Sequence, residues 1–334
     1  MNKCFNVFFD TKIYVVCPPG YKTGGTELAH QLVKELNNIG REAMITYYGD
    51  AERAINPAFF EYVDSFCNIE DVEDKDHNII VFPEIVPEME KAFYNIQKCV
   101  WWMSVDNYLA THNLEYYAKN NGYFKTLRHV LKGKFQLNGD VINKNIMHLY
   151  QSEYARLFLE ERGIVNSERL SDYINDAYLN NSLSNTEREN IVLYNPRKGF
   201  KFTKKIIQCA KDCKFVALEN FTNSEVKNLL NKSKVYIDFG NHPGKDRFPR
   251  EAAICGCCII TGKDGAAGNC IDIPIGEDFK IEAKEENLCL VCDRIRKCLR
   301  DYDVETKKFD SYRELIRKEH AAFCEDAKRL FGNN

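Results

Sequence analysis

The segment from residue 234 to residue 262 combines apolar strands with residues suited to binding an anion. It reads KVYIDFGNHPGKDRFPREAAICGCCIITG and predicts a buried strand over Val235–Phe239, a polar loop, a short helix opened by Pro249, and a second strand over Cys257–Thr261. Proline suits a first helical position because its missing N–H has no partner there, and Gly256 ends the helix. The free amides and the positive dipole end of such a helix form an anion site that faces the loop.

Glu251 follows Pro249 by two residues and is placed in the first turn of that predicted helix. In this position its carboxylate would accept hydrogen bonds from ribose hydroxyls while phosphates take the helix amides. The alternative is an ordinary strand–loop–helix–strand unit, in which the glutamate only complements the helix dipole. The segment alone leaves both interpretations open.

The run PREAAICGCCIITG resembles the C-terminal signature of retaining glycosyltransferases with the GT-B fold, of the group 1 or family 4 type. In that family a glutamate followed by small residues, a glycine and an apolar strand binds the ribose of a nucleotide-sugar donor. The resemblance implies that Glu251 is the ribose ligand. Arg250, directly before it, is a further candidate for donor binding.

A second match to this family lies near the other end of the chain. Residues 13–40 predict a strand over Ile13–Cys17, a loop containing Gly24 and Gly25, and a helix whose apolar residues recur at helical spacing. Glycines in the first βα turn of an α/β domain let a backbone approach a ligand closely. The family carries a Gly-Gly pair here, next to the donor diphosphate and the acceptor. A simple helix-capping loop is the alternative.

The third match is IVLYNPRKGF at residues 191–200, in which an apolar strand is followed at once by Arg197 and Lys198. The family places an arginine and a lysine after the first strand of its C-terminal domain, where they neutralise the donor diphosphate. Two cations would stabilise a leaving nucleoside diphosphate without a metal ion. Taken alone, such a pair is usually a solvated loop. The three matches occur in the order that the family has.

Two further positions show where this chain departs from the family pattern. In WWMSVDNY, residues 101–108, many family members have a His-Asp pair that faces the donor sugar, and only Asp106 remains here. Asp106 is either a ligand of the sugar or acceptor, or the N-cap of the following helix. A second family glutamate, eight residues before the ribose ligand, is replaced by Pro243. Asp246 is the nearest carboxylate and the candidate to contact the transferred sugar in its place.

Other features of the sequence bear on the nucleotide and on metals. Asn220 and Phe221 follow a predicted strand over Lys214–Leu218 and are candidates for contact with the base. Pairs of aspartates such as Asp74 with Asp76 resemble the metal motif of another transferase fold, but they lie in charged stretches typical of solvated loops. The resemblance therefore implies a nucleotide-sugar donor with no metal and no other cofactor.

Composition limits the class of protein and its partners. The 334 residues are 44% hydrophobic and 28% charged, with a net charge of -3, which is typical of a globular protein and gives no case for nucleic-acid binding. The chain has fourteen cysteines and no apolar run of about 18 residues. We expect cytoplasmic, reduced thiols that act as small buried side chains rather than zinc ligands. Location at the inner face of a membrane stays open.

Short apolar strands alternate with helical stretches, which indicates α/β domains with parallel sheets. We expect an N-terminal Rossmann-like acceptor domain over residues 1–165, a polar linker over 166–190, and a C-terminal donor domain over 191–309. A last helix within 310–334 returns to the first domain, as the resemblance implies. The expected fold is GT-B, with two parallel sheets facing across a cleft.

The expected function is transfer of a sugar from a nucleotide sugar to a hydroxyl of a glycan or lipid-linked acceptor, in the synthesis of a surface polysaccharide or lipopolysaccharide. Retention of configuration follows from the resemblance. A nucleotide-sugar epimerase of the same fold and a non-catalytic binding subunit are the alternatives. The basic and apolar segment FKTLRHVLKGKFQ, residues 124–136, either contacts an anionic membrane or lipid-linked acceptor or, as we favour from sequence, forms a solvated helix face.

Overall fold

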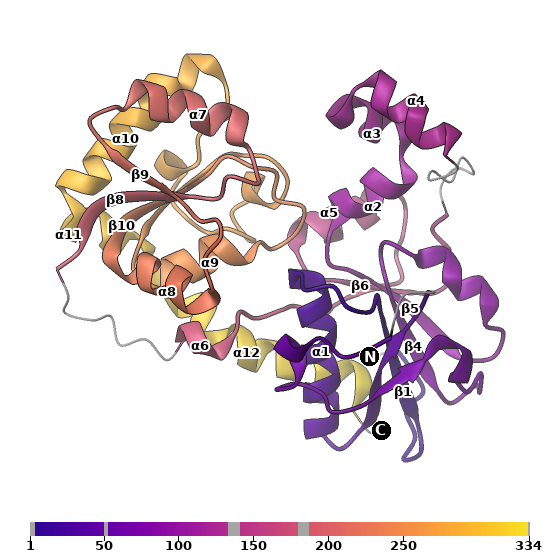
Figure 1. Cartoon of the computed structure of the whole chain (residues 1–334). Helices are drawn as coiled ribbons and strands as arrows, with labels where there is room; N and C mark the ends of the chain where they lie inside the picture. The colour runs from indigo at the N-terminus through magenta and orange to yellow at the C-terminus, as the bar shows by residue number, and fades with distance from the viewer. Residues whose placement is uncertain (1–3, 50–52, 133–140, 180–186, 333–334) are drawn as a thin grey trace. The chain divides into compact units, whose positions relative to one another are not determined.

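The computed structural model describes residues 4–49, 53–132, 141–179 and 187–332 (Figure 1). It forms two compact units. Unit 1 comprises Met1–Asp172 and Ala321–Asn334, and unit 2 comprises Tyr173–His320. Each unit is a parallel β-sheet with helices in the crossovers, as alternating apolar strands and amphipathic helices predict. The α/β fold class expected from sequence is therefore confirmed.

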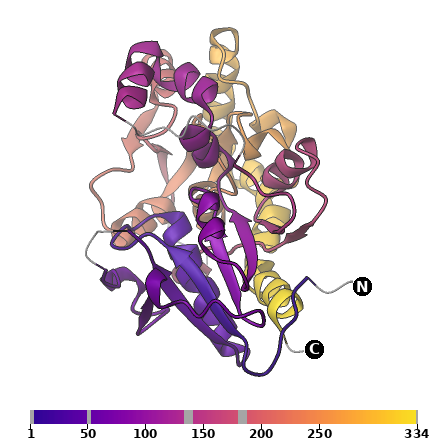
Figure 2. The same cartoon turned by 90° about the vertical axis from the view of Figure 1, so that its right-hand side faces the viewer.

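Unit 1 contains a seven-stranded parallel sheet with the order β3-β2-β1-β4-β5-β6-β7. Figure 2 shows its strands, coloured indigo to magenta, side by side. The strands are β1 (Lys12–Cys17), β2 (Glu42–Tyr47), β3 (Phe66–Asn68), β4 (Ile79–Pro83), β5 (Gln97–Trp102), β6 (Met147–Tyr150) and β7 (Ser167–Arg169). The helices that belong wholly to this unit are α1 (Gly24–Asn38), α2 (Val105–His112), α3 (Leu114–Asn121), α4 (Tyr123–Leu131) and α5 (Glu153–Glu161).

The winding of this sheet reverses at β1, which lies between β2 and β4. The chain moves from β1 outward to β2 and β3, and then back across to β4 on the other side. In open parallel sheets such a reversal leaves a crevice at the carboxyl ends of the strands, where ligands bind. The loops after β1 and β4 are therefore the places in unit 1 where functional side chains are expected.

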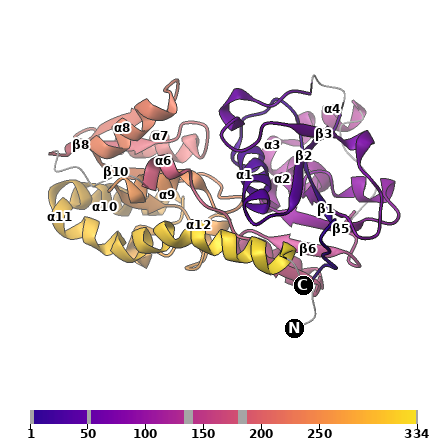
Figure 3. The ribbon, with the colours of Figure 1, turned by 90° about the horizontal axis from the view of Figure 1, so that it is seen from below.

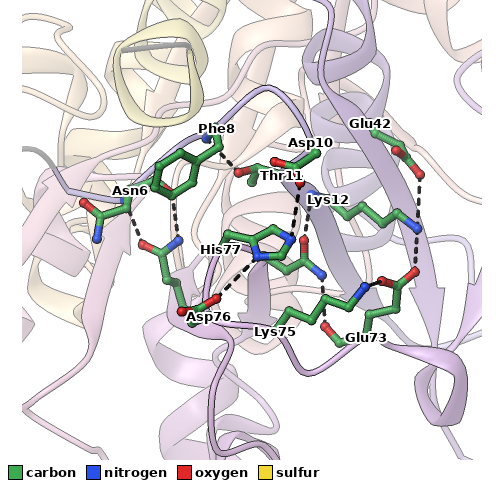
Figure 4. A network of polar contacts seen from close by, with 12 residues as sticks. Asn6, Phe8, Asp10, Thr11, Lys12, Glu42, Glu73, Lys75, Asp76 and His77 are labelled. Carbon is green, nitrogen blue, oxygen red and sulfur yellow. Dashed lines mark hydrogen bonds and ion pairs between the residues drawn. The ribbon is translucent and has the colours of Figure 1, made fainter.

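The opposite, amino-terminal edge of this sheet is held by a polar network (Figure 4). Lys12, at the start of β1, lies 2.5 Å from Glu73 and 3.7 Å from Glu42, and Lys75 lies 2.6 Å from Glu73. Hydrogen bonds from Lys12 and Lys75 lower the pKa of Glu73 to about 2. These contacts join β1, β2 and the segment before β4, so we assign them a structural role.

Unit 2 contains a four-stranded parallel sheet with the order β11-β10-β8-β9. Its strands are β8 (Glu189–Tyr194), β9 (Lys214–Ala217), β10 (Ser233–Asp238) and β11 (Cys258–Thr261). The helices that belong wholly to this unit are α6 (Asp176–Leu179), α7 (Phe200–Cys209), α8 (Asn223–Lys232), α9 (Arg247–Ile254), α10 (Leu288–Arg300) and α11 (Tyr302–Glu305). The sheet reverses between β8 and β10, so the loops after these two strands meet at the second switch point.

The last helix, α12 (Asp310–Phe331), is a single helix that is coloured yellow in Figure 3. Its first half belongs to unit 2, and its residues from Ala321 onward belong to unit 1. In unit 1 the ring of Phe323 lies 6.3 Å from that of Trp101, and Phe331 stacks on Phe5 at 5.4 Å. No helix in the described part of the chain is both long enough and apolar enough to cross a membrane.

The predicted strands lie within two residues of those observed, but two edge strands were not predicted. β3 and β7 are three residues long, and β7 (Ser167–Arg169) falls in the stretch 166–190 that we expected to be a linker. That stretch also contributes α6 to unit 2, and its residues 180–186 lie outside the described residues. Strands of three residues are too short to show an apolar run or an alternating pattern in sequence, and at the edge of a sheet they depend on pairing with one neighbour.

Candidate functional site

The loop after β8 carries the two predicted cations and is shaped by a glycine. Arg197 is exposed, and its backbone N–H donates to the side chain of Asn195 at 3.0 Å. Gly199 has φ of 61° and precedes α7 directly. A Cβ at Gly199 would lie 2.2 Å from the carbonyl oxygen of Phe239, which follows β10. Only glycine therefore lets the loops after β8 and β10 pack this closely.

Lys198 joins these two loops through its ammonium group. Its Nζ lies 2.9 and 2.8 Å from the two carboxylate oxygens of Asp246, and the lysine side chain is 33% exposed. Gly240 makes room for it, because a Cβ there would lie 2.4 Å from Cβ of Lys198. The structure thus brings together two residues that the sequence singled out separately.

Asp246 is the N-cap residue of α9, although its side chain does not cap the helix. Burial acts to raise the pKa of Asp246, but His242 and Lys198 outweigh it and lower that pKa. A carboxylate therefore occupies a position beside a cation and a helix N-terminus. A cation and a helix N-terminus both stabilise negative charge, so the same surroundings would favour binding of a diphosphate.

His242 is fully buried between two aspartates. Its Nδ1 lies 3.1 Å from Asp246 Oδ2, and its Nε2 lies 3.8 Å from Asp238 Oδ1. Burial acts to lower the pKa of His242, but the contact with Asp246 and the charge of Asp238 outweigh it and raise that pKa. Tyr236 donates to Asp238 at 2.9 Å. Ion pairs and one hydrogen bond therefore link the half-buried Lys198 and Asp246 to the buried His242, Asp238 and Tyr236.

Asp238 and Tyr236 were not among the residues predicted from sequence. Both lie in β10, two residues apart, so they share one face of the strand. A tyrosine and an aspartate alternating with apolar residues in KVYIDF was the available signal. It was overlooked because the strand as a whole reads as a buried apolar run.

The start of α9 differs from the sequence prediction. The helix begins at Arg247, so Pro249 is its third residue and not its first, and Glu251 is its fifth and lies beyond the first turn. Proline fits there because the first four N–H groups of a helix have no partner within the helix. The predicted stop is confirmed: Cys255 is the C-cap, and Gly256 follows with φ of 98°.

Arg250 is fully buried, and its guanidinium binds the loop that precedes α9. It donates to the carbonyl oxygens of Lys245 at 2.7 Å and Asp246 at 3.1 Å, and to Glu319 at 2.8 Å. Lys245 also pairs with Glu319 at 2.6 Å. Arg250 therefore holds the Asp246 loop in shape, and this contact set favours a positioning role over direct donor contact.

Asn220 and Phe221 follow β9, the strand beside β8, and both are exposed. Asn220 has φ of 59°, a left-handed conformation that asparagine tolerates better than most residues. Because parallel strands end on the same edge of a sheet, this loop shares an edge with Lys198. Contact of Asn220 and Phe221 with a nucleotide base stays a prediction.

In unit 1, Gly24 and Gly25 are the first two residues of α1 and do not lie in a loop before it. Thr23 is the N-cap, and with Thr26 it forms a capping box. A Cβ at Gly25 would lie 3.9 Å from the side chain of Met103, which is an ordinary contact. Packing within unit 1 therefore does not require glycine at residue 25, which is consistent with a backbone kept bare for a ligand.

Asp106 is buried as the second residue of α2, and the structure rules out its use as the N-cap. Ser104 is the N-cap, and its side chain accepts from the N–H of Asn107 at 3.3 Å. Asp106 instead accepts a hydrogen bond from Tyr154 of α5 at 3.0 Å. The bond ties α2 to α5, and a contact of Asp106 with sugar or acceptor stays a prediction.

Glu84 is a buried carboxyl group that the sequence analysis missed. It follows β4 directly, at the switch point of the unit 1 sheet, and its Oε2 accepts from the N–H of Met103 at 3.2 Å. Burial raises the pKa of Glu84 to about 8. A glutamate after the apolar strand IIVFP was its only signal in the sequence.

Asp238, His242 and Asp246 bring ligand atoms of the kind that bind metals close together, but Lys198 already pairs with Asp246. All fourteen cysteines are free thiols. Cys255, Cys257 and Cys258 are buried, and burial raises the pKa of Cys257 to about 11. They therefore stay protonated and act as small packed side chains.

No known family model matches this sequence, and no curated protein does either. Solved structures do match in fold. A glycosyltransferase from Rickettsia africae ESF-5 matches with a TM-score of 0.62 and 15% identity over 100% of both chains. Sucrose-phosphate synthase from Thermosynechococcus elongatus matches with a TM-score of 0.61 and 13% identity, covering 96% of this chain and 98% of that one.

The Anabaena protein HepE, in complex with UDP and glucose, matches with a TM-score of 0.62 and 12% identity, covering 96% of this chain and 99% of its own. At such identities the likeness establishes the fold and nothing finer. The chain thus has the GT-B fold of glycosyltransferases, as the sequence resemblance predicted.

Proposed function

We propose that this chain is a glycosyltransferase that moves a sugar from a nucleotide sugar to a hydroxyl group of a glycan or lipid-linked acceptor. The observation that carries the proposal is the meeting of Lys198 with the N-terminus of α9 at the switch point of the unit 2 sheet. A cation and a helix N-terminus together stabilise the diphosphate of the donor and of the leaving nucleotide.

In this proposal Lys198 and Arg197 bind the diphosphate. The resemblance implies that the backbone at Gly24 and Gly25 also serves the donor diphosphate. Arg250 positions the loop. Glu251 binds the ribose, as the resemblance implies. The sugar leaves with its diphosphate already neutralised, so the C–O bond breaks without a metal ion.

Asp246 is proposed to contact the transferred sugar, with Asp106 serving the sugar or acceptor. Asn220 and Phe221 are proposed to contact the base. A uridine nucleotide is the first candidate, because UDP is bound in the HepE complex. Transfer with retention and a role in surface polysaccharide synthesis extend the proposal and rest on the family resemblance.

The test is incubation of the purified chain with UDP-, GDP-, dTDP- and CDP-sugars, with release of nucleoside diphosphate and the sugar products followed by NMR. We expect slow donor hydrolysis with one nucleotide class and faster release when the acceptor is present. EDTA should leave the rate unchanged, and a loss that Mn²⁺ restores would contradict metal-free transfer. Interconversion of donor sugars without nucleotide release would identify an epimerase instead.

A further inference from the structure

The helix α4 exposes a continuous row of large apolar side chains. Tyr123 is 84% exposed, Phe124 93%, Leu127 59% and Leu131 78%. At about 100° per residue, these four positions fall within an arc of about 100° on one side of the helix. Contiguous exposed apolar side chains of this size mark an interaction surface.

The other side of α4 packs on the neighbouring helix, so the apolar row faces outward. Thr126 is buried, and the ring of His129 stacks on that of Tyr117 in α3 at 4.8 Å. Figure 1 shows the α3–α4 pair beyond α2, away from the labelled strands of unit 1. The row is therefore not the core-facing side of an amphipathic helix.

Basic side chains border the apolar row. Lys125, Arg128 and Lys132 are exposed and occupy roughly the next 60° of the helix circumference. Lys125 bonds to the neutral side chain of Asn121 at 2.9 Å. None of the three basic groups forms an ion pair within the described residues. Over residues 116–139 the sequence holds Lys and Arg but no Asp or Glu, although the whole chain carries a net charge of -3.

We propose that α4 docks this chain on an anionic lipid bilayer. Tyr123, Phe124, Leu127 and Leu131 enter the boundary between headgroups and acyl chains, and the basic side chains contact lipid phosphates. An exposed apolar face bordered by Lys and Arg is the pattern of a helix that lies in the plane of a membrane. The solvated helix face that we favoured from sequence does not account for four exposed large apolar groups.

Charge argues against a second copy of the chain as the occupant. A two-fold contact through α4 would bring the same surface patch from both copies together. Lys125, Arg128 and Lys132 of each copy would then lie near those of the other with no acidic residue on the helix between them. An anionic lipid surface instead supplies the opposite charge, and each basic group near such a surface strengthens binding about fivefold.

The test is flotation of the full chain with neutral phosphatidylcholine vesicles and with vesicles containing about 30% phosphatidylglycerol. We expect binding at least tenfold stronger to the anionic vesicles, with most of it lost in about 0.5 M salt because the charges are screened. Phe124→Ser with Leu131→Ser should reduce binding at least tenfold, and so should Lys125→Glu with Arg128→Glu.

Matched controls are Phe9→Ser, which removes another exposed phenylalanine of unit 1, and Lys91→Glu, which reverses an exposed charge there. Both should bind vesicles as the parent does. Equal binding by all variants, or no preference for anionic vesicles, overturns the proposal. Sedimentation showing a dimer that Phe124→Ser with Leu131→Ser abolishes would assign the face to a second copy instead. Donor hydrolysis is measured separately and does not decide this outcome.

Discussion

Asp246 accepts two hydrogen bonds from Lys198, and its Oδ2 lies 3.1 Å from Nδ1 of His242. An ionised carboxylate has about four lone-pair sites, so Asp246 keeps acceptor capacity for a sugar hydroxyl. The residue therefore combines two roles in the proposal, orienting the lysine and contacting the sugar. Only the pairing with Lys198 can affect the binding of a bare nucleoside diphosphate, because that ligand carries no sugar for Asp246 to contact.

We predict that Asp246→Asn lowers kcat/KM for transfer by about 10- to 100-fold, the loss of one charged hydrogen bond. Affinity for the bare nucleoside diphosphate should stay equal or rise, because Lys198 no longer pairs with a protein carboxylate. Calorimetry and kinetics measure the two quantities. Asp212→Asn, which removes an exposed pair with Arg296, is the control. Transfer at the parent rate by Asp246→Asn would remove Asp246 from the site.

Glu84 gives a prediction about pH. Its pKa is about 8 in the fold, whereas an unfolded glutamate ionises near its ordinary value. Between those pH values the folded chain binds more protons than the unfolded chain, so this group makes stability fall as pH rises. Below the unfolded pKa both states are protonated and the penalty vanishes.

The variant Glu84→Gln should therefore be more stable than the parent at pH 7.5, by on the order of 2–4 kcal/mol, and equally stable near pH 4.5. Thermal unfolding at several pH values measures this. Glu115→Gln, at an exposed site on α3, should show no such pH-dependent gain. A gain for Glu84→Gln that is the same at every pH would show that Glu84 is not buried in its neutral form.

At the scale of elements, glycines set how closely the site loops approach. Gly199 has both a positive φ and a carbonyl 2.2 Å from where a Cβ would lie, whereas Gly25 has only ordinary contacts around it. The first glycine is thus required by the fold, and the second is proposed to serve the ligand. The two substitutions to alanine should separate these roles.

We predict that Gly199→Ala destabilises the chain by about 2–4 kcal/mol, because the new side chain strains the backbone and displaces the loop that follows β10. Gly25→Ala should keep or slightly raise stability, because alanine favours a helix, while weakening nucleotide binding. Denaturant unfolding and calorimetry on both variants measure these effects. Unchanged stability in Gly199→Ala would mean that the two loops do not pack as described.

Much of the element structure could be predicted from sequence because buried parallel strands appear as short apolar runs. β1, β8 and β10 all begin within two residues of their predicted starts. The edge strands β3 and β7 could not be predicted in this way, because pairing with a neighbouring strand specifies them. The start of α9 was misplaced because proline at its third position reads, in sequence, as a helix start.

The site was predictable as a set of residues but not as a geometry. Lys198 and Asp246 were each marked by a motif, yet nothing in a sequence shows that residues 48 positions apart form an ion pair. Asp238 and Glu84 were missed because a single carboxyl group in or after an apolar strand carries no spacing pattern. Tertiary contact, not local sequence, determines these interactions.

For the whole molecule, the GT-B fold is established by structural likeness at 11–16% identity, while the reaction stays a proposal. The fold alone does not determine an activity, because chemistry depends on the site grafted onto it. The proposed reaction therefore depends on whether unit 2 binds a nucleoside diphosphate at Lys198. The proposals that concern unit 1, an acceptor and membrane docking by α4 do not decide this point.

The most direct test is calorimetry of UDP, GDP, dTDP and CDP binding to the parent chain, Lys198→Ala and Lys211→Ala. Lys211 is an exposed lysine that precedes β9, so it lies near the amino-terminal ends of the parallel strands, whereas Lys198 follows the carboxyl end of β8. We predict that one nucleotide binds the parent and Lys211→Ala equally and binds Lys198→Ala about 10- to 150-fold more weakly, a loss of about 1.5–3 kcal/mol. No binding by the parent, or equal affinity in Lys198→Ala, would contradict the proposed donor site.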